Sequence, residues 1–234
     1  MTAVRFIADN DDFAPRNHAS GCWCELAPGH LDFAGRPALF LDRDGVIVED
    51  TGYVCRAEDA HVIGGAAAAI ARCNTLRIPV IVVSNQSGIA RGLYDWNGFA
   101  VVQGVIDDAL AAAGARLDAV FACAHHREGQ APLNIADHPW RKPSPGMLMD
   151  AAERMTLDLP RSWIAGDRAS DIAAGKAAGL AGGILILSPS LPGERDAAIL
   201  FRSKDFMVEI VSSLTEAVEL LLTRGAFSEP KSVP

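Results

Sequence analysis

The sequence has no long hydrophobic run and no leader-like N-terminus. Its longest apolar stretches, such as residues 78–83 and 182–187, are far shorter than the roughly 20 apolar residues of a membrane-spanning helix. Residues 1–10 contain early acidic side chains and no apolar core, unlike a secretory signal peptide. We therefore expect a cytoplasmic protein that does not bind a membrane.

Basic residues are also few. The chain has 21 Lys and Arg against 29 Asp and Glu, which gives a formal net charge of −8. Because proteins that bind nucleic acid usually carry a broad basic surface, we expect no nucleic-acid partner. An anionic small molecule is still allowed, since it needs only a local basic pocket.

Cysteine is scarce and irregularly spaced. Five cysteines in 234 residues, an odd number without a framework pattern, indicate reduced thiols. Cys22 and Cys24 lie close together, but no second pair with suitable spacing accompanies them. We therefore interpret them as part of a packed edge segment and not as a metal or redox site.

Apolar residues are abundant in the sequence and occur in short alternating blocks. Hydrophobic residues make up 50% of the chain, enough for a sizeable core. Apolar runs of strand length alternate with alanine-rich stretches, which is typical of βαβ units and of a parallel sheet buried on both faces. We expect an irregular N-terminal arm over residues 1–36, one domain over residues 37–227 and a disordered tail over residues 228–234.

The predicted fold class is α/β: a doubly wound, mostly parallel sheet with a Rossmann-like core in three α/β/α layers. The expected strands are residues 38–41, 80–84, 119–124, 162–165 and 183–187. The expected helices are residues 65–77, 96–113, 145–155, 170–178 and 214–223. In such a sheet, ligands bind beyond the carboxyl ends of the strands.

Reactive side chains follow four of these strands. Carboxylates come after the first and the fourth: Asp42, Asp44, Asp167 and Asp171. Hydroxyl and amide side chains follow the second, at residues 84–88, and Lys142 comes after the third. Each group alone has an ordinary explanation, such as a turn or a helix cap. Together, each just beyond an expected strand, they predict a site where a hard cation and a lysine hold a phosphate.

The chemistry of such a site follows from charge. A carboxylate and a phosphate monoester repel one another, so attack requires cations that screen both. A divalent cation and Lys142 would supply this screening and stabilise the charge on the transferring oxygens.

This set of motifs resembles the haloacid dehalogenase (HAD) superfamily of aspartyl phosphatases, over about residues 38–183. The resemblance implies that Asp42 is the nucleophile that takes the phosphoryl group. It implies that Asp44 is first the acid for the leaving alkoxide and then the base for water. Dehalogenases of the superfamily lack this second carboxyl, which favours a phosphatase.

The resemblance also implies a role for each of the other polar groups. Mg²⁺ would be the cofactor, and Ser84 and Lys142 would hold the phosphoryl oxygens. The implied metal ligands are Asp42, the backbone carbonyl of Asp44 and Asp167, with Asp171 supporting the ion or its waters.

The intervals between the motifs indicate a capless member of the superfamily. The segments from Asp42 to Ser84 and from Ser84 to Lys142 are too short for an additional domain. We therefore expect an open site with no cap domain. A flap at residues 45–64 and the long connection at residues 125–141 would then recognise the substrate.

The residues in these motifs resemble one group within the superfamily more specifically. Residues 40–45, 52–54, 84–92 and 141–147 resemble the D-glycero-D-manno-heptose 1,7-bisphosphate 7-phosphatases, relatives of the histidinol-phosphate phosphatases. This resemblance implies that Arg141 contacts a second phosphate. The implied substrate-binding residues are Arg43, Asp50, Thr51, Gly52, Tyr53, Asn85, Gln86, Ser87, Arg91, Arg141 and Arg168.

The sequence departs from this group in two places. The group has a structural zinc site in the long loop, but Trp140 occupies one cysteine position here, and tryptophan is not a ligand. The remaining candidate ligands are Cys123, His125 and His138, with His126 or Asp137 as a fourth. Because a structural site needs four ligands, we expect no zinc. Arg168 replaces the usual lysine after the fourth-motif aspartate, which keeps the charge but changes the geometry.

Several functions stay open. A sugar-bisphosphate phosphatase comes first, followed by hydrolysis of histidinol phosphate or another small phosphomonoester. A catalytically idle binding protein is disfavoured because Asp42 and Asp44 are both present, and a phosphotransferase would need a cap to exclude water. We expect a small phosphorylated metabolite as the partner, and a monomer or small homo-oligomer.

Overall fold

The computed structural model describes residues 21–228. Residues 1–20 of the predicted arm and residues 229–234 of the predicted tail lie outside the described residues. Within residues 21–228, no helix is both long enough and apolar enough to cross a bilayer.

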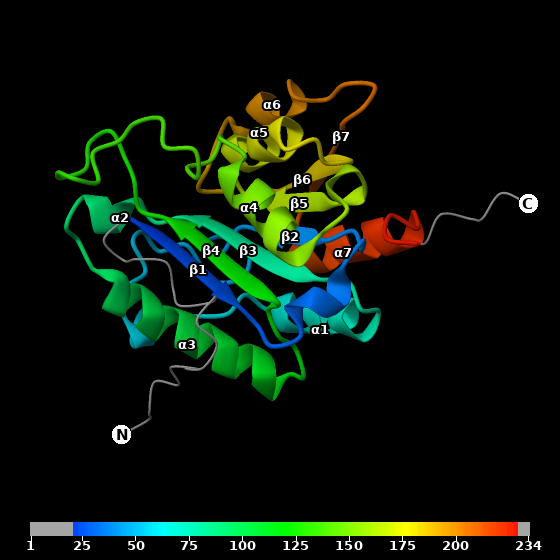
Figure 1. Ribbon diagram of the computed structural model, residues 1–234, viewed down its shortest axis with the longest axis horizontal. Helices are drawn as coiled ribbons and strands as arrows, with labels where there is room; N and C mark the ends of the chain where they lie inside the picture. The colour runs from blue at the N-terminus through cyan, green and yellow to red at the C-terminus, as the bar shows by residue number, and fades with distance from the viewer. Residues whose placement is uncertain (1–20, 229–234) are drawn as a thin grey trace, which may run out of the picture.

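The described residues form one seven-stranded sheet in the order β1-β4-β3-β2-β5-β6-β7 (Figure 1). β1 pairs antiparallel with β4 and the other neighbours pair in parallel. The strands are β1 Cys22–Leu26, β2 Leu39–Leu41, β3 Val80–Asn85, β4 Ala119–Cys123, β5 Trp163–Gly166, β6 Gly182–Ile186 and β7 Met207–Val211.

Helices cover both faces of the sheet, which gives the three predicted layers (Figure 1). One core lies under α1, α3 and α7, and the other lies under α4 and α5. The α-helices are α1 Ala66–Thr75, α2 Ser87–Ala90, α3 Trp96–Ala112, α4 Gly146–Met155, α5 Ala169–Ala177, α6 Glu194–Ile199 and α7 Leu214–Thr223. Short 3-10 helices are η2 His30–Phe33, η3 Ala57–Asp59 and η4 Leu159–Arg161.

The predicted α/β class is confirmed, and each of the five predicted strands is present. β2 to β6 are almost completely buried, because helices pack on both of their faces. The five predicted helices also lie close to their expected bounds. Asp95 accepts a hydrogen bond from the Gly98 amide at the start of α3, and Ser213 caps α7 in the same way.

Two strands, β1 and β7, and two short α-helices, α2 and α6, were not predicted. The expectation of an irregular segment up to residue 36 is wrong for Cys22–Leu26, which forms β1. β1 is a half-buried edge strand with mixed polar and apolar residues, so it lacks the apolar run that identifies the inner strands. The interpretation of Cys22 and Cys24 as part of a packed edge segment agrees with this position. β7 and α6 were missed because both are short and partly exposed.

The segments between the catalytic motifs add no second domain. Between Asp42 and Ser84 the structure places the flap, η3, α1 and most of β3, and between Ser84 and Lys142 it places α2, α3 and β4. Among residues 21–228, the carboxyl edge of the sheet is therefore bordered by loops and by parts of α2, α5 and α6.

Candidate active site

The predicted motifs meet at the carboxyl edge of the three central strands. β2 lies between β3 and β5. Asp42 directly follows β2, Asp167 directly follows β5, and Ser84 lies at the end of β3. Lys142 enters from the long loop after β4, which extends beyond the left side of the sheet in Figure 1. Four segments far apart in the sequence thus form one site.

Three carboxylates form the centre of this site. Oxygens of Asp42, Asp167 and Asp171 lie within 4.8 Å of one another, and all three residues are buried. Burial raises the pKa of Asp42 to about 7, an effect that Lys142 partly offsets and Asp171 reinforces. Burial, with added repulsion from Asp42 and Asp171, raises the pKa of Asp167 to about 8. The cluster is therefore a place where negative charge needs a cation.

The donor set fits Mg²⁺. Oxygens around Mg²⁺ lie about 2.1 Å from the ion, so opposite ligands are about 4.2 Å apart and the three carboxylates need little movement. Asp167 has a buried Oδ1 without a hydrogen-bond partner, which an ion would satisfy. Gly45 has φ 80°, and a Cβ there would lie 2.3 Å from Asp167 Oδ2, so glycine is needed for the approach of the flap.

Lys142 supplies the permanent positive charge of the site. Its Nζ lies 3.0 Å from Asp42 Oδ1 and 2.6 Å from Asp171 Oδ1, and it donates to the Val83 carbonyl at 2.7 Å. Burial alone would lower the pKa of Lys142, but Asp171 and Asp42 outweigh it and raise the pKa. Lys142 thus stays charged beside Asp42, as its predicted phosphate-binding role requires.

The raised carboxyl pKa values predict how pH affects the metal-free protein. Asp42 and Asp167 hold protons in the folded state up to about pH 7 and 8, whereas unfolded aspartates lose them near pH 4. Because the folded state then binds more protons than the unfolded state, the free energy of unfolding falls as pH rises through this window. We expect the Tm in EDTA to fall between pH 5 and pH 8.5, and Mg²⁺ to raise the Tm more at pH 8 than at pH 6.

Asp167→Asn provides the control for this thermal-denaturation series. It removes one titrating carboxyl, so the variant should lose part of the pH dependence in EDTA and most of the stabilisation by Mg²⁺. A parent Tm in EDTA that stays flat or rises from pH 5 to pH 8.5 would contradict the assignment of protons to this cluster.

The polar residues at the end of β3 contact the neighbouring motifs. Ser84 is buried, and its Oγ accepts a hydrogen bond from Gln86 Nε2 at 2.8 Å. Asn85 forms a reciprocal pair with the backbone of Lys142: Nδ2 donates to the carbonyl and Oδ1 accepts from the amide, each at 3.0 Å. Asn85 therefore holds the backbone of Lys142 in place.

Asp44 lies at the mouth of the site and Arg43 lies behind it. Arg43 is fully buried and its Nε donates to Asp44 Oδ1 at 3.0 Å. The Asp44 side chain is 23% exposed, so it can meet a leaving oxygen in the cleft. The sequence-based expectation was that Arg43 binds substrate, but the structure places it under Asp44 and away from the cleft surface.

A cleft of about 740 Å³ opens over these groups. The predicted site residues that line it are Asp42, Asp44, Asp50, Gly52, Tyr53, Ser84, Asn85, Gln86, Ser87, Arg141, Lys142, Arg168 and Asp171. The flap is joined to the opposite rim, because Arg168 Nη2 lies 3.4 Å from Asp50 Oδ2. Thr51 is exposed and does not line the cleft, whereas Asp167 is buried beneath it.

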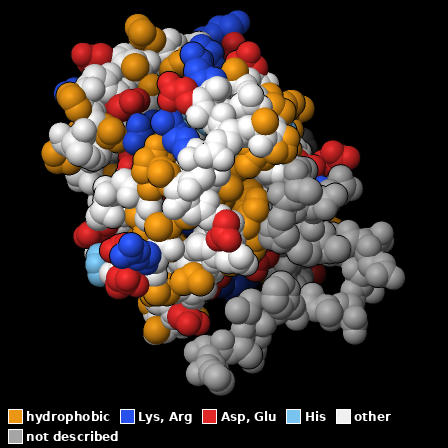
Figure 2. Space-filling model, turned by 90° about the vertical axis from the view of Figure 1, so that its left-hand side faces the viewer, with side chains coloured by type: hydrophobic (Ala, Val, Ile, Leu, Met, Phe, Trp, Pro, Cys, Tyr) orange, Lys and Arg blue, Asp and Glu red, His pale blue; other side chains and the backbone are white. Residues whose placement is uncertain are grey.

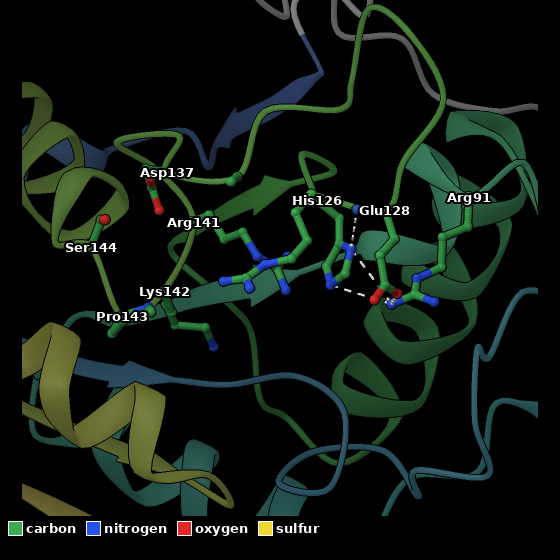
Figure 3. Close-up of a pocket in the computed structure, with 10 residues that line it drawn as sticks. Arg91, His126, Glu128, Asp137, Arg141, Lys142, Pro143 and Ser144 are labelled. Atoms are coloured by element: carbon green, nitrogen blue, oxygen red, sulfur yellow. Dashed lines mark hydrogen bonds and ion pairs between the residues drawn. The ribbon is translucent and has the colours of Figure 1, made fainter.

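A second cavity of about 530 Å³ adjoins the cleft and shares Arg141 and Lys142 with it. Arg91, which was expected near the substrate, lies here with Glu128, and their charged groups are 2.9 Å apart. Figure 3 shows Arg141 and His126 pointing into this space, with Arg91 beyond them. Figure 2, viewed from the left of Figure 1, shows basic and acidic side chains gathered on this face.

Five residues of the cleft were not predicted. They are Tyr94, Ala169, Ser170, Glu194 and Ala197. Ser170 lies between two recognised aspartates, which is a local signal for it. Ala169 lies between the same aspartates, at the start of α5. Tyr94 lies in a loop and Glu194 and Ala197 lie on α6, and their position at the cleft depends on tertiary packing that no local pattern reports.

The three candidate zinc ligands, which were expected to form an incomplete set, do not come together in the structure. Ligand atoms of Cys123 and His138 lie within 4.8 Å of Cys22 on β1, and His125 does not belong to this group. The rings of His125 and His138 stack, with centroids 3.9 Å apart and an interplanar angle of 13°. Stacked rings cannot both direct a ring-plane lone pair at one ion.

Comparison with known proteins agrees with the geometry. The HAD-hydrolase-like family model matches residues 139–217. D-glycero-beta-D-manno-heptose-1,7-bisphosphate 7-phosphatase of Mesorhizobium japonicum is 49% identical over 166 residues, 71% of this chain and 76% of the relative. The protein of the same name from Rhodopseudomonas palustris is 42% identical, over 63% of this chain and 82% of its own length.

Solved structures show the same fold. A HAD-like phosphatase from Mesorhizobium loti superposes with a TM-score of 0.76 and 42% identity, covering 86% of this chain and 94% of its own. D,D-heptose 1,7-bisphosphate phosphatase from B. bronchiseptica, solved with magnesium and phosphate, has a TM-score of 0.67 and 29% identity, covering 80% and 99%. The chain therefore belongs to the D-glycero-β-D-manno-heptose-1,7-bisphosphate 7-phosphatase family of HAD-like hydrolases.

Proposed function

We propose that this protein is a Mg²⁺-dependent phosphatase that removes one phosphate from a heptose bisphosphate through an aspartyl-phosphate on Asp42. Asp42 attacks phosphorus while Lys142 screens the charge of the phosphoryl oxygens. Asp42, Asp167 and Asp171 would hold the ion, together with the carbonyl of Asp44. When bound, Mg²⁺ would supply Lewis-acid stabilisation of the transferring oxygens.

The observation that carries the bisphosphate assignment is the pair of adjoining cavities. One contains the nucleophile, and the other has a basic wall at Arg141, Arg127 and His126. Because Arg141 and Lys142 line both, a sugar with a phosphate at each end can place one at Asp42 and the other in the second cavity. A monophosphate would leave the second cavity without an anion.

The test of this assignment is a screen across sugar monophosphates, sugar bisphosphates and histidinol phosphate, ranked by kcat/KM. We expect heptose bisphosphates to rank first. A preference for histidinol phosphate or for monophosphates would contradict the bisphosphate assignment and leave the phosphatase chemistry in place.

Arg141→Ala should show whether Arg141 recognises the second phosphate of the substrate. Arg141 Nη1 donates to the His125 carbonyl at 2.9 Å, which leaves its other donors for an anion. Because charge-assisted hydrogen bonds are among the stronger ones, we expect kcat/KM for a sugar bisphosphate to fall about tenfold or more, with little change for a monophosphate.

The matched control is Arg72→Ala. Arg72 is an exposed arginine on α1, and its Nη1 lies 2.7 Å from Glu219 on α7. This variant should keep the preference of the parent for bisphosphates. Equal losses on mono- and bisphosphates in Arg141→Ala would mean that Arg141 does not recognise the second phosphate.

We also propose that the long loop folds without zinc. The stacked rings of His125 and His138, the packing of Trp140 on Phe121 with centroids 5.6 Å apart, and the hydrogen bond from the Trp140 amide to His138 Nδ1 at 3.2 Å support this. Elemental analysis of purified protein that found one zinc per chain would contradict it.

The remaining expectations concern the cellular location, the oligomeric state and the partners of the protein. We propose a cytoplasmic enzyme, monomeric or a small homo-oligomer, without a nucleic-acid partner. The acidic net charge of −8 supports the last of these. Light scattering would test the oligomeric state, and an assembly of many subunits would contradict the proposal.

A further inference from the structure

The carboxyl group of Asp44 is held by three N–H donors. Arg43 Nε donates to Oδ1 at 3.0 Å and Nη2 donates to Oδ2 at 3.2 Å. Gln86 Nε2 donates to Oδ2 at 2.8 Å. Two donors from a rigid guanidinium and one from an amide determine the plane of the carboxyl as well as its position.

The two donor residues are almost completely buried, and Arg43 does not line the cleft. Arg43 is 0% exposed and Gln86 is 2% exposed. The guanidinium carbon of Arg43 lies 4.8 Å from the centroid of the Phe99 ring, which stabilises a buried cation. Arg43 has no accessible surface, and Gln86 meets the cleft with only 2% of its surface, so both have their effect mainly through the Asp44 carboxyl.

Tyr94 determines which way the amide of Gln86 faces. The Tyr94 hydroxyl donates to Gln86 Oε1 at 2.5 Å, and Arg43 Nη2 donates to the same oxygen at 3.2 Å. A flipped amide would turn its NH₂ group toward these two donors and its oxygen toward the Asp44 carboxylate. Burial raises the pKa of the Tyr94 phenol, so the hydroxyl remains a donor.

We propose that Arg43, Gln86 and Tyr94 are positioning residues for Asp44, a role that rests on the proposed phosphatase function. As the bond from phosphorus to the leaving oxygen breaks, Asp44 gives that oxygen a proton. Asp44 then takes a proton from the water that attacks the phosphorus of the aspartyl-phosphate, which releases inorganic phosphate and restores Asp42. The three residues hold the carboxyl where both transfers occur.

The nature of the leaving group distinguishes this role from a general structural one. An alkoxide leaves poorly without a proton, whereas an activated phenolate leaves without help, so only alkyl phosphates depend strongly on a placed acid. kcat/KM covers the steps up to the first phosphoryl transfer, which makes it the correct readout. A displaced Asp44 therefore lowers kcat/KM for alkyl phosphates more than for activated aryl phosphates.

The experiment compares Gln86→Ala, Tyr94→Phe and the double variant on an alkyl phosphate and on a dinitrophenyl phosphate. Gln86 also donates to Ser84, so the ratio of the two kcat/KM values is the diagnostic quantity. We expect the alkyl-to-aryl ratio to fall about tenfold in Gln86→Ala and about threefold in Tyr94→Phe. The double variant should match Gln86→Ala, because Tyr94 acts through that amide.

The control is Leu93→Ala, an exposed neighbour of Tyr94, which should leave the ratio unchanged. Arg43 is not replaced, since the loss of a buried ion-pair partner endangers folding. An unchanged ratio in both single variants, or additive losses in the double variant, would overturn the inference. A parent that hydrolyses neither phosphate would instead overturn the proposed function.

Discussion

Replacing Asp42 with asparagine is expected to lower kcat by about a thousandfold or more, because the amide has no carboxylate oxygen to attack phosphorus. The rest of the site should keep its structure. A neutral asparagine resembles the protonated form of Asp42, and the pKa of about 7 shows that this form is already accessible in the buried site. Activity on a generic aryl phosphate provides the measurement, with thermal denaturation to confirm folding.

The matched control for the nucleophile is Asp107→Asn. Asp107 is an exposed carboxyl on α3 that accepts a hydrogen bond from Gln103 and does not line the cleft. This variant should keep the activity of the parent. Retention of the parent rate by Asp42→Asn would remove Asp42 as the nucleophile.

Asp44→Asn is expected to have the second largest effect, and it should affect the two half-reactions differently. Without the base that activates water, hydrolysis of the aspartyl-phosphate slows by about a hundredfold or more. Formation of the intermediate from an activated aryl phosphate needs no proton, so it should continue. Rapid mixing should then show a burst of phenolate close to one equivalent, followed by slow turnover.

The stability of the Asp44→Asn variant must be measured together with its activity. Arg43 is fully buried and pairs with Asp44 through Nε at 3.0 Å, so asparagine leaves a buried cation without its anion. Breaking such a pair costs about 3–5 kcal/mol, and the Tm should fall accordingly. A folded Asp44→Asn protein with parent-like turnover on alkyl phosphates would show that another group handles the proton.

The sequence was sufficient for the inner part of the fold because parallel strands need apolar residues on both faces. β3 and β4 appear as uninterrupted apolar runs for that reason. β1 was not recognised, because an edge strand such as Cys22–Leu26 carries mixed side chains and its pairing with β4 depends on a partner about 100 residues away. The contact of Cys22 with His138 follows from that register, so it could not be foreseen.

The site was predictable where spacing along one segment determines geometry. Asp42 and Asp44 follow β2 directly, and the order of parallel strands brings Asp167 beside them. The family resemblance placed Arg43 among the substrate-binding residues, and nothing in the local sequence indicates that its side chain is fully buried. Its side chain points to the interior, where Phe99 and Gln86 surround it. Tyr94 carries no motif signal, and only its hydrogen bond to Gln86 reveals its place.

The most direct test is to find the phosphorylated residue. Asp44→Asn is mixed with an activated aryl phosphate and Mg²⁺ and quenched, and the acyl phosphate is reduced with borohydride before peptide mass spectrometry. Homoserine at residue 42, formed only when Mg²⁺ is present, is the predicted result. Modification at another residue, or none at all despite a phenolate burst, would contradict the account of a carboxylate that attacks phosphorus beside a cation.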